Sequence, residues 1–271
     1  MERRDRAASR ALLPLDEVTR RLRAYERRYL GVQEIPVRQI VGTDSRAGDF
    51  DRDFVPLRPA IGARMRRVSQ AFPNGDFPPI VVYQVGDGYF VVDGHHRVAL
   101  ARQRGMVTID AEVTSLRTRW RLPAEADIVQ IIHAEQEQMF MEQSGLARTH
   151  PDARIRFSRP AGYLELLENV QIHGYHLMLS AGRALERGEI ADDWYERVYL
   201  PAVEAIRREG LAPASSGATE ADLFLCLYQR RRDLFPDDGC PPLEDVARDW
   251  TANTGNGKRG TLRRLLRRQA A

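Results

Sequence analysis

The sequence predicts an α+β protein, in which a small mixed-sheet domain is followed by an all-helical domain. Two β-branched runs, Ile80–Tyr83 and Tyr89–Val92, flank a Gly-Asp-Gly turn and indicate a β-hairpin. A helix should follow this hairpin directly, and the alternating segment Thr108–Val113 should form a closing strand. After residue 123 the apolar spacing is helical, so the second domain should consist of helices.

The first segment has the pattern of an amphipathic helix from Leu15 to Leu30. Apolar side chains recur there at three- and four-residue steps, arginines fill most other positions, and Gly31 should end the helix. We therefore expect four parts in the 271 residues: an N-terminal helix in 1–32, the mixed-sheet domain in 33–116, the helical domain in 117–252 and a flexible basic tail in 253–271.

Within the mixed-sheet domain, 41–59 is expected to be a loop and Ala60–Ala71 a helix. Pro73 and the pair Pro78-Pro79 should stop this helix and extend the chain into the hairpin. Gly105 should close the helix after the hairpin, because glycine readily takes the left-handed conformation at that position.

The second domain should contain five helices. Their expected ranges are Ala124–Ser144, Leu164–Arg187, Asp193–Glu209, Glu220–Leu234 and Leu243–Trp250. Thr219 and Asp222 resemble a capping box at the start of the fourth helix. Trp194 and Tyr199 follow helical spacing, so we expect them to pack between helices.

The turn between the hairpin and its helix combines Asp93, Gly94, His95, His96 and Arg97. The first N–H groups of a helix lack intrahelical acceptors and lie at the positive end of the helix dipole, so they attract anions. Gly94 lacks the Cβ that would keep a phosphate away, and the guanidinium and imidazoles offer further donors. We predict that Gly94, His95, His96 and Arg97 bind a phosphate or nucleotide.

Asp93 ends the second hairpin strand and could hold a ribose hydroxyl, a magnesium ion or Arg97 itself. Asp93 and His96 are therefore also candidate catalytic residues. In the alternative interpretation the turn is purely structural, with Asp93 capping the helix and one histidine serving as a satisfied structural group.

Three aspartates alternate with other residues in the loop before the first helix of this domain: Asp49, Asp51 and Asp53. An extended backbone would place the three carboxylates on one side. Clustered carboxylates bind Mg²⁺, and one among several has a raised pKa and can act as a base. We predict a metal site at Asp51 and Asp53; the alternative is a solvated turn in which Phe50 and Phe54 pack inward.

Charge and composition limit the classes of function. The net charge is +3, but 258–268 holds six cations and no acid, so the remainder sums to −3 and any affinity for DNA should lie in this tail. Cys226 and Cys240 are too few for a disulfide framework or a four-thiolate zinc site. The sequence has no apolar run long enough for a transmembrane segment, so we expect a cytoplasmic protein.

A histidine pair, His173 and His176, lies at i and i+3 on one helical face, a spacing compatible with metal binding. No third ligand is evident from the sequence, and a structural role is the alternative.

The turn Asp93–Arg97, with the hairpin before it and the helix up to Gly105, resembles the nucleotide-binding signature of the ParB/sulfiredoxin superfamily. ParB partition proteins carry a Gly-Glu-Arg-Arg version, sulfiredoxin a Gly-Cys-His-Arg version and free serine kinases an Asp-Gly-His-His-Arg version. Glu34–Ile40 is similar to the opening strand of the superfamily. More narrowly, the chain resembles a bacterial family that joins a ParB-like nuclease-type domain to a helical C-terminal region.

The resemblance implies a ParB/sulfiredoxin-like fold that binds a nucleotide, such as ATP, ADP or CTP, and Mg²⁺ is compatible with it. A kinase of this fold would transfer phosphate to a small hydroxylated acceptor, with Glu34, Asp51 or Asp53 as base. His95 stands where sulfiredoxin has its cysteine, which argues against a thiol reductase.

Two other classes remain open. One is a non-enzymatic, nucleotide-gated regulator of the chromosome-partitioning type that binds DNA or protein, although no clear helix-turn-helix pattern supports it. The other is a ParB-like nuclease. The resemblance does not decide whether the protein is an enzyme, and the oligomeric state is open.

Overall fold

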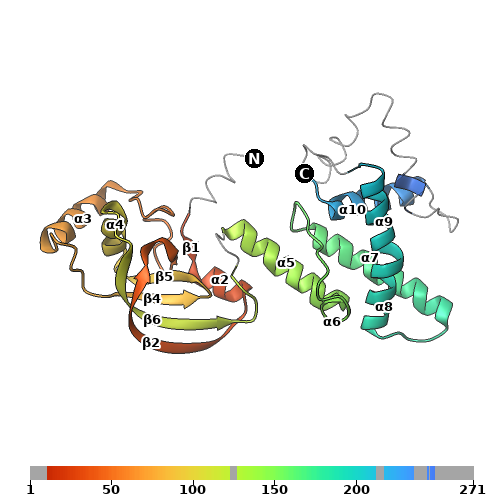
Figure 1. Ribbon diagram of the computed structural model, residues 1–271, viewed down its shortest axis with the longest axis horizontal. Helices are drawn as coiled ribbons and strands as arrows, with labels where there is room; N and C mark the ends of the chain where they lie inside the picture. The colour runs from red at the N-terminus through yellow and green to blue at the C-terminus, as the bar shows by residue number, and fades with distance from the viewer. Residues whose placement is uncertain (1–10, 123–126, 212–216, 235–242, 244, 248–271) are drawn as a thin grey trace, which may run out of the picture. The chain divides into compact units, whose positions relative to one another are not determined.

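The computed structural model describes residues 11–122, 127–211, 217–234, 243 and 245–247. The chain divides into two compact units, Met1–Glu135 and Gln136–Ala271, and each is considered by itself (Figure 1). The predicted domain limits stay predictions, and the basic tail lies outside the described residues. No helix in the described ranges has both the length and the apolar character needed to cross a membrane.

The first unit is built on a six-stranded mixed sheet with the strand order β1-β3-β5-β4-β6-β2. The strands are β1 (Leu13–Pro14), β2 (Ala24–Pro36), β3 (Ile40–Thr43), β4 (Ile80–Val85), β5 (Gly88–Asp93) and β6 (Thr108–Thr118). β1, β3 and β5 are parallel, as are β4 and β6, whereas the pairs β4/β5 and β2/β6 are antiparallel. The predicted hairpin is confirmed as β4 and β5, and with it the α+β class.

Helices pack on this sheet and close its core. They are α2 (Leu15–Arg21), α3 (Pro59–Ala71), α4 (His95–Gln103) and the short 3₁₀ turn η1 (Val37–Gln39). Figure 1 shows α3 beside α4, and α4 buries Val98 and Leu100 in one core with strand residues such as Ile80 and Val113. The prediction of helix Ala60–Ala71 is confirmed by α3.

The end of α4 confirms the predicted role of Gly105. Gly105 has a φ of +67°. Its N–H donates to the Arg102 carbonyl at 3.0 Å, and the Met106 N–H donates to the Ala101 carbonyl at 2.9 Å. These are the two hydrogen bonds of a Schellman motif, which satisfies carbonyls that the helix would otherwise leave free.

The predicted helix Leu15–Leu30 is wrong beyond Arg21. Arg23 takes a positive φ of 54°, and from Ala24 the chain continues as the edge strand β2, antiparallel to β6. Tyr25 and Tyr29, which gave the helical spacing, are each 63% exposed. The backbone pairing with a distant strand therefore decided this segment, which local periodicity alone could not reveal. For the same reason the expected loop after residue 40 begins with the strand β3.

The remaining described elements are helical. They are α5 (Ile128–Ser144), α6 (Leu146–Thr149), α7 (Gly162–Ala181), α8 (Arg187–Trp194), the π-helical turn η2 (Tyr195–Tyr199), α9 (Leu200–Arg208) and α10 (Glu220–Leu234). The predicted start of α10 is confirmed, because Asp222 N–H donates to the Thr219 hydroxyl and Thr219 N–H to the Asp222 carboxylate. The helix expected at Asp193–Glu209 begins earlier, at Arg187, and the one expected from Leu243 lies largely outside the described residues.

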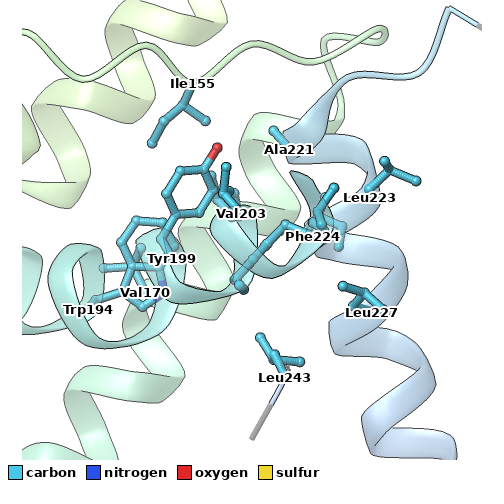
Figure 2. Packing of buried hydrophobic residues seen from close by; sticks show 14 of the residues in the cluster. Ile155, Val170, Trp194, Tyr199, Val203, Ala221, Leu223, Phe224, Leu227 and Leu243 are labelled. Atoms are coloured by element: carbon cyan, nitrogen blue, oxygen red, sulfur yellow. The ribbon is translucent and has the colours of Figure 1, made fainter. Parts of the chain in front are cut away.

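Aromatic rings fill the core of the helical unit. Figure 2 shows Trp194, Tyr199 and Phe224 at its centre, with ring centroids 5.2 Å apart for Trp194 and Tyr199 and 5.1 Å for Tyr199 and Phe224. The buried indole N–H of Trp194 donates to the Asn169 side-chain carbonyl at 2.7 Å. The packing role predicted for these aromatic residues is thereby confirmed.

We expect Gly42→Ala to lower the free energy of unfolding by about 1–3 kcal/mol through overpacking. A Cβ at Gly42 would lie 2.3 Å from the Phe90 ring and 2.4 Å from the Leu13 carbonyl, where β1, β3 and β5 adjoin. Urea unfolding measures the change. Gly48→Ala is the matched control, because the nearest atom to its new methyl group lies 3.9 Å away. Equal stability of the two variants would contradict this packing.

Candidate anion-binding site

The turn between β5 and α4 presents an open helix N-terminus. Gly94 occupies the N-cap position with a φ of +102°, and no side chain caps the helix. The first hydrogen bond of the helix runs from the Val98 N–H to the Gly94 carbonyl at 3.0 Å. The N–H groups of the first turn are therefore available to an anion, as the sequence predicted.

The need for glycine at position 94 has a different physical cause from the one expected. A Cβ there would lie 2.5 Å from the Ile80 Cγ2 and 3.1 Å from the Arg97 guanidinium carbon. Together with the positive φ, this contact with the neighbouring strand excludes any side chain. Core packing thus explains Gly94 before any ligand is considered.

His95 is a satisfied core residue. It is 4% exposed, its Nε2 lies 2.7 Å from the Thr43 hydroxyl, and its ring stacks on Phe50 with centroids 6.1 Å apart. Burial and, to a smaller extent, the positive charge of Arg46 lower the pKa of His95 to about 4. His95 is therefore neutral at neutral pH and ties α4 to the end of β3.

His96 is different, because both of its ring nitrogens are buried and have no hydrogen-bond partner among the described residues. The edge of its ring meets Phe50, with centroids 5.6 Å apart. Burial lowers the pKa of His96, and the positive charges of Arg64 and Arg46 lower it further. Buried polar atoms are rarely left unpaired in folded proteins, so these two nitrogens are candidate contacts for a ligand, and ligand binding by His96 stays a prediction.

Arg97 is engaged by the protein itself. Its Nη1 donates to the carbonyls of Pro78 at 2.7 Å and Pro79 at 2.6 Å, and its Nη2 donates to Asp93 at 2.5 Å. The Arg97 side chain is 15% exposed, whereas that of Asp93 is 74% exposed. Asp93 was expected to hold a ribose hydroxyl, a magnesium ion or Arg97, and in the structure it pairs with Arg97. Phosphate binding by Arg97 stays a prediction.

The loop that carries Asp49, Asp51 and Asp53 forms a turn with Phe50 and Phe54 packed inward, which was the alternative to a metal site. Phe50 and Phe54 are buried, and one oxygen of Asp51 accepts the N–H groups of Asp53 at 3.0 Å and Val55 at 2.8 Å. The Asp53 carboxylate lies 3.6 Å from Arg102. Within the described ranges neither aspartate belongs to a group of three metal-ligating side chains. Mg²⁺ binding at Asp51 and Asp53 stays a prediction.

The structure does not bring Glu34 to the turn. Glu34 lies on β2 and accepts a hydrogen bond from the Thr108 hydroxyl. In the strand order, β4 and β6 separate β2 from β5, which carries Asp93. Three strand spacings amount to about 14 Å, so the Glu34 carboxylate is too far from this turn to exchange a proton there directly.

Sequence reasoning missed Thr43, Arg46 and Arg64. The Thr43 hydroxyl accepts the Arg46 N–H at 3.1 Å, which holds the segment after β3 beside His95. The missed signal is β3 itself: since β3 and β5 are parallel, their carboxyl ends meet at one edge of the sheet, where ligands of such sheets often bind.

Comparison with known proteins identifies the domain type. Residues 31–126 match the sequence profile of the ParB N-terminal domain, which confirms the resemblance to the ParB/sulfiredoxin superfamily. A search of curated protein sequences gave no match.

Three solved structures are similar to the chain. The C-terminally truncated chromosome-partitioning protein ParB from Caulobacter crescentus, complexed with CTP-gamma-S, is 19% identical with a TM-score of 0.24, over 60% of this chain and 98% of that one. A Pnob8-like ParB-N domain is 10% identical with a TM-score of 0.24, over 77% and 83% of the two chains. A second structure of a pNOB8-like ParB N-domain is 11% identical with a TM-score of 0.23, over 78% of each chain.

We expect the stability of the protein to fall on acidification through His95. Because the folded-state pKa is about 4 and the ordinary value is 6.5, the unfolded chain binds this proton more readily. The contribution of His95 to the free energy of unfolding is complete above pH 7 and decreases as the pH falls below 6.5. At pH 5 the loss is about 2 kcal/mol. Urea unfolding of wild type and His95→Gln at pH 7.5 and 5.0 measures it. The exposed His176 serves as control, and His176→Gln should lose as much stability between pH 7.5 and 5.0 as wild type. If His95→Gln also loses as much as wild type, the acid sensitivity does not come from His95.

We expect Arg97→Lys to destabilise the ligand-free protein by about 1–3 kcal/mol, because one ammonium cannot replace two guanidinium nitrogens with three acceptors. Urea unfolding without nucleotide measures this loss. The matched control is Arg117→Lys, since Arg117 makes a single exposed ion pair with Glu26 at 3.0 Å. Equal stability of Arg97→Lys and wild type would show that the hydrogen bonds of Arg97 to Pro78, Pro79 and Asp93 do not stabilise the protein.

Proposed function

We propose that the ParB N-terminal domain formed by residues 31–126 binds a nucleotide, with its phosphates at the N-terminus of α4. The observation that carries this proposal is an uncapped helix start beside the two unpaired ring nitrogens of His96. Backbone N–H groups at a helix start bind phosphate without any specific side chain. The family match supports the same ligand class.

Arg46 and Arg64 supply the positive charge in this proposal. Both act on the pKa of His96, so both guanidinium groups lie within electrostatic range of the helix start. Arg46 is 42% exposed and reaches Asp49 only at 3.9 Å, which leaves its donors available to a phosphate. Arg97 has a positioning role, because it holds the Pro78-Pro79 segment against the turn.

We favour a nucleotide-gated regulator over a kinase or nuclease. Phosphoryl transfer to a hydroxyl requires a base within hydrogen-bond reach of the acceptor. Of the expected bases, Glu34 lies three strands away, one Asp51 oxygen accepts two backbone N–H groups, and the Asp53 carboxylate lies 3.6 Å from Arg102. The regulated partner would be DNA or protein, and the six cations of 258–268 are the part of the sequence suited to DNA.

Calorimetric titration of the full chain with CTP, ATP and ADP, each with and without Mg²⁺, tests the proposal. CTP is included because the Caulobacter ParB was crystallised with a CTP analogue. We expect one nucleotide per chain, and at least tenfold weaker binding for Arg46→Ala and for Arg64→Ala, since each removes charge-assisted donors.

Arg117→Ala is the control for charge, because its guanidinium lies on β6 and pairs with Glu26. Its affinity should equal that of wild type. Absence of saturable binding by any of the three nucleotides would overturn the proposal. Transfer of phosphate from the bound nucleotide to a small hydroxylated acceptor would instead favour the kinase class.

A further inference from the structure

The helical unit contains a cluster of three side chains that could bind a metal ion, which the sequence did not suggest. His150 follows α6, and Asp192 and Glu196 lie four residues apart on the continuous run of α8 and η2. One ligand atom from each lies within 4.8 Å of the other two. His150 Nε2 is 2.8 Å from an Asp192 oxygen. In the part of the chain that the structure describes, this is the one such group of three.

The charges of this cluster are not balanced by the neighbouring protein groups. The adjacent Asp193 is neutralised, because it lies 2.8 Å from His173 and 3.2 Å from Arg197. Asp192 has only the imidazole of His150, and exposed Glu196 has no hydrogen-bond or ion-pair partner among the described residues. A metal ion binds the neutral form of an imidazole, so two carboxylates with one such ligand would present a charge of about −2, which a divalent cation neutralises.

The backbone and the rings around the cluster hold two of its members in place. The Tyr195 ring lies against His150 with centroids 4.5 Å apart, which limits rotation of the imidazole. Glu196 lies in the π-helical turn Tyr195–Tyr199, and π-helical turns occur often at functional sites. Trp194 and Tyr199, on either side, are buried in the core, so the turn that carries Glu196 is anchored at both ends.

We propose that His150, Asp192 and Glu196 bind a divalent transition-metal ion of the Zn²⁺ or Mn²⁺ class. Tetrahedral ligands about 2.1 Å from a metal lie about 3.4 Å from one another, so binding requires the exposed Glu196 side chain to move closer to the other two ligands than the 4.8 Å limit within which they now lie. The imidazole favours such ions over Mg²⁺ and Ca²⁺, which prefer oxygen ligands alone. Three protein ligands on an exposed surface leave at least one position for water or a partner group.

The site differs from the histidine pair that the sequence suggested. His173 is paired with Asp193, and His176 is exposed and belongs to no ligating group within the described ranges. The proposed site lies wholly in the helical unit and does not depend on nucleotide binding by the first unit.

Calorimetric titration with ZnCl₂ and MnCl₂ tests the site in the full, tag-free chain after treatment with a chelator. We expect one ion per chain with micromolar or tighter affinity for at least one metal. Glu196→Gln and His150→Ala should each weaken binding at least tenfold. His176→Ala is the matched control and should bind as wild type does. Glu196→Gln is the cleaner variant, because this exposed side chain has no partner within the described ranges whose loss would disturb the fold.

Thermal unfolding gives a second readout. The metal should raise the unfolding midpoint of wild type, His176→Ala and the nucleotide-site variant Arg46→Ala, but not that of Glu196→Gln. No saturable binding below millimolar metal, or equal binding by wild type, Glu196→Gln and His150→Ala, would overturn the proposal. Because Arg46→Ala tests the other unit, failure of nucleotide binding and failure of metal binding are distinguishable.

Discussion

The left-handed turn at Gly94 is the constraint on which the first unit depends. It reverses the chain from β5 into α4 while the Ile80 side chain occupies the space that a Cβ would need. Arg97, one turn into the helix, fixes the same corner by binding two carbonyls of the segment that leads into β4. The core and the Arg97 guanidinium therefore both fix the start of the helix, and no side chain caps its first N–H groups.

The polar residues of the turn Asp93–Arg97 therefore have two different roles. His95 and Arg97 stabilise the corner, one through the Thr43 hydroxyl and the other through backbone carbonyls and Asp93. His96 is left with unpaired nitrogens close to two cations from other elements. In the proposed function this division leaves the backbone N–H groups of the helix start and the His96 imidazole for an anion, so that little binding energy would go into ordering the site.

The helical unit follows a similar principle with different chemistry. Its core aromatic residues hold the run from α8 to α9 in place, and three neighbouring acids on this run, Asp192, Asp193 and Glu196, differ in their partners. Among the described residues, Asp193 pairs with His173 and Arg197, Asp192 pairs with His150 alone, and Glu196 has no hydrogen-bond or ion-pair partner. This difference in pairing is the basis of the proposed cation site at His150, Asp192 and Glu196.

The sequence by itself determined the features that depend on neighbouring residues: the hairpin β4/β5, α3, the start of α4 after Gly94, its Schellman end at Gly105, and the capping box of α10. Each rests on hydrogen bonds or backbone preferences within a few positions. Only the tertiary structure decided that the segment after Arg23 is a strand, that β3 brings Arg46 to His95, and that Arg97 serves the protein's own carbonyls. It alone brought His150 to Asp192 and Glu196. These outcomes depend on partners between about 20 and 90 positions away, and a linear pattern contains no information about which distant backbone or side chain will satisfy a given donor.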